Sequence, residues 1–129
     1  MKYTVVVHSS PYSGQSARTA LSFCRELINR QHQLLCVFFF HDGVSNAARW
    51  TESPQGEVNL PAQWSSFHEN SAVPLLLCVS AGARRGLVDQ QSDMEDEPIE
   101  LINDGFEIAG LGRLVEASTE SDRLITFGN

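Results

Sequence analysis

Apolar residues recur along the chain in two alternating patterns, one typical of buried strands and one typical of helices. Residues 2–8 and 34–40 are near-continuous apolar runs, as expected for strands that are covered on both faces of a sheet. Between them, residues 15–31 carry apolar side chains at helical spacing. Strand, helix and strand in this order predict a βαβ unit with a right-handed crossover.

The same alternation continues to the end of the chain. Residues 62–70 predict a second helix, with Trp64 and Phe67 on one side of it. The later elements are a strand, a short helix, a strand, a helix that follows a turn at 110–112, and a last strand, over residues 73–79, 80–87, 106–108, 112–118 and 123–127. This order predicts a three-layer α/β/α fold around a mostly parallel, roughly five-stranded sheet.

The composition is that of an ordinary globular protein. The chain has 129 residues, 42% of them hydrophobic and 19% charged, which predicts one domain over residues 1–129. Its apolar runs are too short to span a membrane and its start lacks the features of a signal peptide, so we expect a cytoplasmic location. The net charge of −7 argues against direct binding of nucleic acid, because an acidic chain repels phosphate. Acidic residues crowd into residues 89–100, which predicts a solvated loop or a docking surface for a basic partner.

A cysteine closes the apolar run of the third predicted strand. The apolar run 73–78 ends at Cys78, and a short helix is expected to begin at Ser80. The sulfur would then lie at the carboxyl edge of the sheet, where α/β proteins bind ligands and carry out chemistry. The helix start, together with Arg84 and Arg85, would supply positive potential that stabilises a thiolate. The alternative is a buried core residue, because free cysteine packs as a small hydrophobe.

The remaining cysteines and two histidines give weaker signals. Cys24 lies on the apolar side of the first predicted helix and Cys36 lies inside the second strand, so packing roles are predicted for both. No cysteine and histidine spacing matches a metal site, and a cytosolic location disfavours structural disulfides. His8 and His41 follow predicted strands, and the sequence leaves open whether either one approaches Cys78.

One loop is a candidate for completing the thiol site. The loop after the first strand would open on the same edge of the sheet as Cys78, and Tyr12 within it is expected to line the site. The loop has neither of the glycine patterns of phosphate-binding loops. Tyr12, Ser80, Arg84 and Arg85 are therefore the predicted supporting residues.

Several short segments, taken together in order and spacing, are similar to those of one known family. These are residues 11–15, 37–44, 46–47, 77–81, 84–86, 105–106, 110–112, 116–118 and 122–123. Through them the chain resembles the DsrE-like sulfur-relay family over nearly its whole length.

The resemblance implies a DsrE-like fold and a sulfurtransferase in which Cys78 holds sulfur as a persulfide, without a metal or an organic cofactor. It implies a heterohexamer with TusB-like and TusC-like subunits. Sulfur would arrive from a TusA-like carrier and leave to a TusE-like acceptor. The implied pathway is 2-thiolation of the wobble uridine of tRNA, with a different protein as the enzyme that touches tRNA.

Three other interpretations remain open from the sequence. The chain could be a DsrE-type subunit of a sulfur-oxidation relay. It could instead be a non-catalytic structural subunit in which Cys78 is buried and inert. A flavodoxin-like small-molecule binding module is the third, and the missing phosphate-loop glycines weigh against it.

Overall fold

The computed structural model describes residues 1–88 and 100–128 of the chain. Its elements are β1 (Lys2–Val7), α1 (Ser16–Asn29), β2 (Gln33–Phe39), the 3-10 helix η1 (His41–Ala47), α2 (Leu60–Ser71), β3 (Leu75–Cys78), α3 (Val79–Arg84), β4 (Phe106–Ala109), α4 (Leu111–Glu120) and β5 (Arg123–Phe127). The acidic segment 89–100 lies outside the described residues apart from Glu100. No helix in the described ranges is long and apolar enough to cross a membrane.

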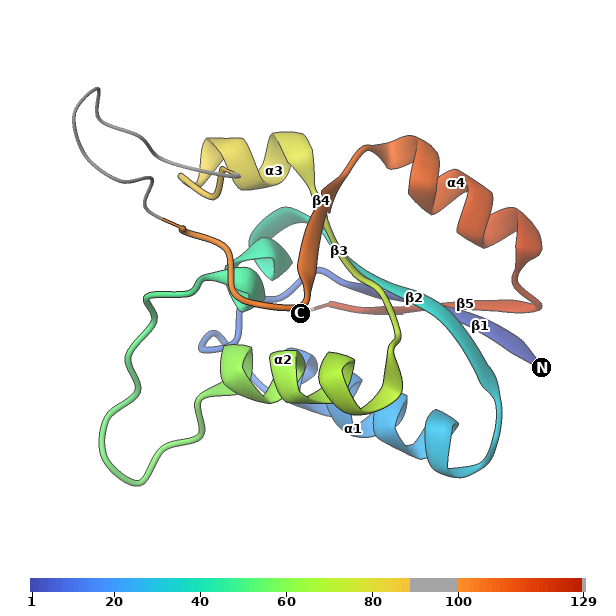
Figure 1. Cartoon of the computed structure of the whole chain (residues 1–129), viewed down its shortest axis with the longest axis horizontal. Coiled ribbons are helices and arrows are strands. Elements are labelled where there is room, and N and C mark those ends of the chain that lie inside the picture. Colours follow the sequence, from blue (N-terminus) through green and yellow to red (C-terminus); the bar gives the residue numbers. More distant parts are fainter. Residues whose placement is uncertain (89–99, 129) are drawn as a thin grey trace.

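The five strands form one sheet in the order β4-β3-β2-β1-β5, and each neighbouring pair runs parallel. Figure 1 shows α1 and α2 on one face of the sheet and α3 and α4 on the other. The connection through α4 carries the chain back across the sheet to the far edge, where β5 pairs with β1. The predicted three-layer α/β/α fold is confirmed, with a sheet that is parallel throughout.

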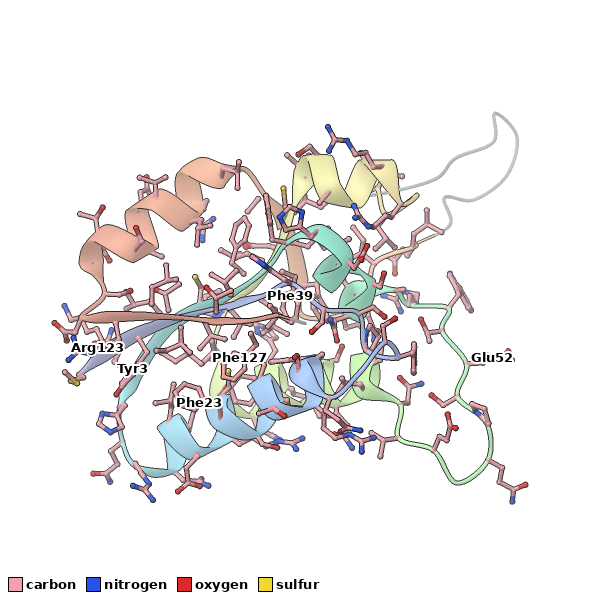
Figure 2. All side chains as sticks on the ribbon, turned by 180° about the vertical axis from the view of Figure 1, so that it is seen from behind. Tyr3, Phe23, Phe39, Glu52, Arg123 and Phe127 are labelled. Atoms are coloured by element: carbon pink, nitrogen blue, oxygen red, sulfur yellow. The ribbon has the colours of Figure 1, made fainter. Side chains whose placement is uncertain are left out.

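Aromatic side chains fill the layer between the sheet and α1 and α2. Phe39 of β2 meets Trp64 of α2 edge to face, with ring centroids 5.0 Å apart, a geometry that aromatic pairs favour. Nearer the β5 edge, Phe23 of α1 lies 6.2 Å from Tyr3 and 5.5 Å from Phe127, centroid to centroid (Figure 2). The central strands are thus covered on this face, as their continuous apolar runs require.

Two helix starts at the carboxyl edge differ from the prediction. Gly110 is extended, with φ −80° and ψ 165°, and it caps α4, which begins at the next residue. The predicted turn at 110–112 is therefore wrong. Gly112 lies in the first turn of α4, where the N–H groups have no helical partner, so a glycine there does not interrupt the helix. α3 begins at Val79 rather than at the next residue, which makes Cys78 its N-cap residue.

A buried asparagine joins three elements at the carboxyl edge. The Nδ2 of Asn46 in η1 donates to the carbonyl oxygens of Ser9, at 3.0 Å, and of Gly43, at 2.8 Å. Its Oδ1 accepts a hydrogen bond from Nε1 of Trp64 at 3.1 Å. A Cβ at Gly43 would overlap the carbonyl oxygen of Val7, so only glycine allows η1 to lie this close to β1. These contacts hold the segment after β2 against the edge of the sheet.

We predict that Asn46→Ala lowers the free energy of unfolding by about 3 kcal/mol, because it leaves buried polar groups of Trp64, Ser9 and Gly43 without partners. Urea titration followed by circular dichroism measures the change. Asn70→Ala, at an exposed position of α2, is the matched control and is expected to change stability by less than about 0.5 kcal/mol. Equal stability of the two variants would contradict a structural role for these hydrogen bonds.

Candidate active site

Cys78 is the last residue of β3 and immediately precedes α3. Its Sγ lies 3.5 Å from the Oγ of Ser80, the second residue of α3. The next two residues along the chain, Val79 and Ser80, are exposed, whereas Cys78 itself is only 1% exposed. The sulfur is therefore at the predicted edge of the sheet, but it is covered in the isolated chain, unlike the accessible sulfur that a carrier needs.

The strand register places Cys78 in a row with two other side chains. Val7 pairs with Phe39, and Phe39 pairs with Leu77. One residue further along each strand are His8, Phe40 and Cys78, and since side chains alternate between faces, these three point to the opposite face from the preceding row. Cys78 thus shares the face covered by α3 and α4 with an aromatic ring and an imidazole.

Two histidines and a phenylalanine form a ring cluster in this row. The ring of Phe40 lies 5.8 Å from that of His8 and 4.1 Å from that of His41, and the two imidazoles are 5.0 Å apart. Burial, and secondly the nearby charge of His41, lower the pKa of His8. His41 has φ 51°, a left-handed conformation that is uncommon outside glycine and that turns the chain from β2 into η1. Phe40 lies between His8 and Cys78 in the row.

The two predicted arginines stand at the far end of α3 from Cys78. The six residues of α3 span about 9 Å along the helix axis. Arg85 binds Asp42 of η1 through Nη2 at 2.9 Å and Nε at 3.2 Å, and its Nη1 donates to the carbonyl oxygen of Ala81. Arg84 is exposed at the last position of the helix. Arg85 therefore fastens the end of α3 to η1, and its charge is engaged by a carboxylate.

Tyr12 lies in the loop between β1 and α1 and is 49% exposed. Its backbone N–H donates to the Oγ of Ser10, and its hydroxyl lies 3.5 Å from the Oγ of Ser53 in the connection between η1 and α2. β2 lies between β1, which leads into this loop, and β3, which ends at Cys78. The role of Tyr12 at the thiol stays a prediction.

The two other cysteines lie inside regular elements. Cys24 of α1 and Cys36 of β2 are buried, and all three cysteines are free thiols. Burial raises the pKa of Cys24 to about 12 and that of Cys36 to about 11. A thiol with so high a pKa carries almost no thiolate near neutral pH, which agrees with the packing roles predicted for both.

Phe40 and Asp42 were not predicted from the sequence as parts of this site. Both flank His41 directly after a buried strand, so their place at the carboxyl edge was a usable signal. Within residues 1–88 and 100–128, no three side chains of histidine, cysteine, aspartate or glutamate are grouped closely enough to hold a metal ion.

Comparison with known proteins gives matches over the whole chain. Residues 1–127 match the DsrE/DsrF-like family. The sulfurtransferase TusD homolog of Vibrio vulnificus is 41% identical over 128 residues, 98% of each chain. The sulfurtransferase TusD of Salmonella arizonae is 37% identical over 128 residues, 98% of this chain and 100% of that one. A relative from Allochromatium vinosum that carries the name DsrE is 35% identical over 130 residues, 100% of both chains.

A solved structure has the same fold. The crystal structure of the ychN protein from E. coli superposes with a TM-score of 0.77 and covers 98% of this chain and 100% of that one, at 24% sequence identity. The expected family is confirmed by the full-length matches and the expected fold by this superposition. The chain belongs to the DsrE/DsrF-like family.

Proposed function

We propose that this chain is a sulfurtransferase subunit of a sulfur relay, in which Cys78 holds the sulfur in transit as a persulfide. The supporting observation is the position of Cys78, which ends a central strand and begins a helix at the carboxyl edge of a parallel sheet. The broader class, a sulfurtransferase, agrees with the names of relatives that match the chain from end to end. A TusA-like carrier is the proposed donor and a TusE-like protein the proposed acceptor.

The chemistry requires one thiol on this chain. The thiolate of Cys78 attacks the outer sulfur of a donor persulfide, so that a new S–S bond forms and the S–S bond of the donor breaks. The donor thiolate leaves with the electron pair, and Cys78 becomes a persulfide. An acceptor thiolate then attacks the outer sulfur and releases the thiolate of Cys78. Neither step needs an external oxidant or reductant.

The burial of Cys78 requires a local movement before transfer. α3 has only six residues, and short elements of this kind open at much lower free energy than the whole fold. Its first residues, Val79 and Ser80, are already exposed. We propose that spontaneous local opening of the first turn of α3, which a docked donor would favour further, exposes the sulfur.

Exposed apolar side chains support an assembly with other subunits. α4 has no fully buried residue, and Leu111 and Val115 on it are 48% and 63% exposed. Leu124 on the edge strand β5 is 41% exposed. Apolar side chains gathered at one side of a domain are typical of protein interfaces. We propose TusB-like and TusC-like partners in a heterohexamer, located in the cytoplasm.

The proposed pathway is 2-thiolation of the wobble uridine of tRNA. A sulfur-oxidation relay is the second candidate, supported by the 35% identity to the relative named DsrE. Both pathways use the same chemistry at Cys78, and they differ in the protein that accepts the sulfur. A third reading, an inert Cys78 in a structural subunit, is supported by its 1% exposure.

We predict that the wild-type chain gains one sulfur atom from glutathione persulfide, a small donor that needs no docking surface, and that Cys78→Ser gains none. Intact-mass spectrometry before and after reduction measures the loading. Cys36→Ser is the matched control and should load like the wild type, because burial raises the pKa of that thiol to about 11. Loading of Cys78→Ser, or of neither protein, would contradict the carrier role.

A second prediction distinguishes a Cys78 that carries sulfur from a Cys78 that is buried and inert. In native buffer Cys78 should react with N-ethylmaleimide at least about 10-fold faster than Cys24 and Cys36, because only α3 must open to reach it. Peptide mass spectrometry after timed pulses gives the three rates, and the same assay in urea should make them similar. Equal rates in native buffer would favour an inert, buried Cys78.

A further inference from the structure

The ring cluster of His8, Phe40 and His41 lies beside Cys78 and has no part in the sulfur transfer described above. Neighbouring strands lie about 4.8 Å apart, so the backbone of Phe40 is one strand spacing and that of His8 two spacings, about 10 Å, from Cys78. His41 is in ring contact with both Phe40 and His8. A charge on this cluster is therefore within electrostatic reach of the thiol.

The cluster holds one proton more readily than two. The imidazoles of His8 and His41 are 5.0 Å apart, and two like charges at this distance repel each other. Burial, and then the charge of His41, lower the pKa of His8. His41 is the exposed ring of the pair, and His8 is half-buried.

We propose that the His8–His41 pair places a single, pH-dependent positive charge beside Cys78, which stabilises its thiolate and favours negatively charged reactants. An imidazole is charged at acid pH and neutral at alkaline pH, so the charge is lost as the pH rises through the range in which histidine side chains titrate. The inference rests on the proposed role of Cys78, and it treats both histidines as positioning residues.

The charge acts on the transfer step without changing its balance. As the thiolate attacks, negative charge moves from the Sγ of Cys78 through the transferred sulfur to the sulfur that leaves the donor. A positive charge beside this path stabilises the state in which the sulfurs share the negative charge. The imidazoles form no bond to sulfur and transfer no electrons.

The other charged side chains around the pair are of types that ordinarily do not titrate near neutral pH. Asp42 on η1 is paired with Arg85 of α3, and Arg84 at the end of α3 stays charged. α2 meets η1 through the uncharged Trp64, and β5 ends beside the pair at the uncharged Gly128. α4, which also covers this face, contributes Arg113 and Glu116, and neither arginine nor glutamate ordinarily titrates near neutral pH. Among the described residues named here, the two histidines are therefore the source of a charge change in this range, apart from the thiol itself.

The test compares two alkylating reagents on the full chain, iodoacetate, which is an anion, and iodoacetamide, which is neutral. Both reagents react with the thiolate, so the ratio of their rates at Cys78 does not depend on the fraction of thiolate. The ratio therefore reports the local charge. Between about pH 5.5 and about pH 7.5 the wild-type ratio is expected to fall about 3-fold at low salt, and the fall should disappear in about 1 M salt. Peptide mass spectrometry assigns the label to Cys78.

Variants of His41 identify the source of the change. His41→Asn removes the exposed imidazole with a residue that tolerates positive φ, so the ratio at about pH 5.5 should be lower and should change less with pH, because burial still lowers the pKa of the remaining His8. His41→Lys keeps a fixed charge, so the ratio should stay high across the range. His32→Asn, at the opposite edge of the sheet before β2, should retain the wild-type profile.

Three outcomes would overturn the inference: a wild-type ratio that does not change with pH, the same pH profile in His41→Asn as in wild type, and no alkylation of Cys78 by either reagent. Thermal melts of each variant check that the fold is intact. Sulfur loading of the same preparations is measured separately. A chain that loads sulfur on Cys78 with a flat ratio retains the proposed function and refutes the role of the histidine pair.

Discussion

Parallel pairing in register brings the carboxyl ends of β1, β2 and β3 to one edge of the sheet, where Val7, Phe39 and Leu77 share a row. Each backbone hydrogen bond of this ladder fixes the next, so a slip by one residue would turn every side chain of a strand to the other face. The candidate site depends on this register. The register brings residues from three strands together at the carboxyl edge, and it turns Cys78 toward the face that α3 and α4 cover.

The edge is completed by contacts that join the segments after these strands. Asn46 ties η1 to the end of β1 and to α2, and Arg85 ties the end of α3 to Asp42 of η1. The first set is buried and the second is partly exposed, so the asparagine contributes far more to stability than the ion pair. η1 is thus held against β1 and α2, and α3 is bound to η1 mainly at the end that lies away from Cys78.

This arrangement reconciles a covered sulfur with the proposed transfer function. A persulfide is easily reduced or lost to small thiols in solution, so a carrier gains from a sulfur that is shielded between encounters. Cys78 is covered by its own surroundings, while Val79 and Ser80, the first two residues of the short helix α3, are exposed. Local opening of such an element exposes a thiol at small energetic cost and leaves the packed layers beneath it unchanged.

The sequence alone determined the elements and the position of Cys78 among them, because apolar periodicity and turn residues are local signals. β5 was predicted at its observed bounds, and Cys78 was predicted one residue before the end of a strand that in the structure ends at Cys78. The covering of Cys78, the His8–Phe40–His41 cluster and the Arg85–Asp42 pair were decided by the tertiary structure. Arg85 and Asp42 are 43 residues apart, and only the order and register of the strands bring such residues together. Apolar periodicity contains no information on the order of the strands, because a buried strand has the same apolar pattern whichever strand it pairs with.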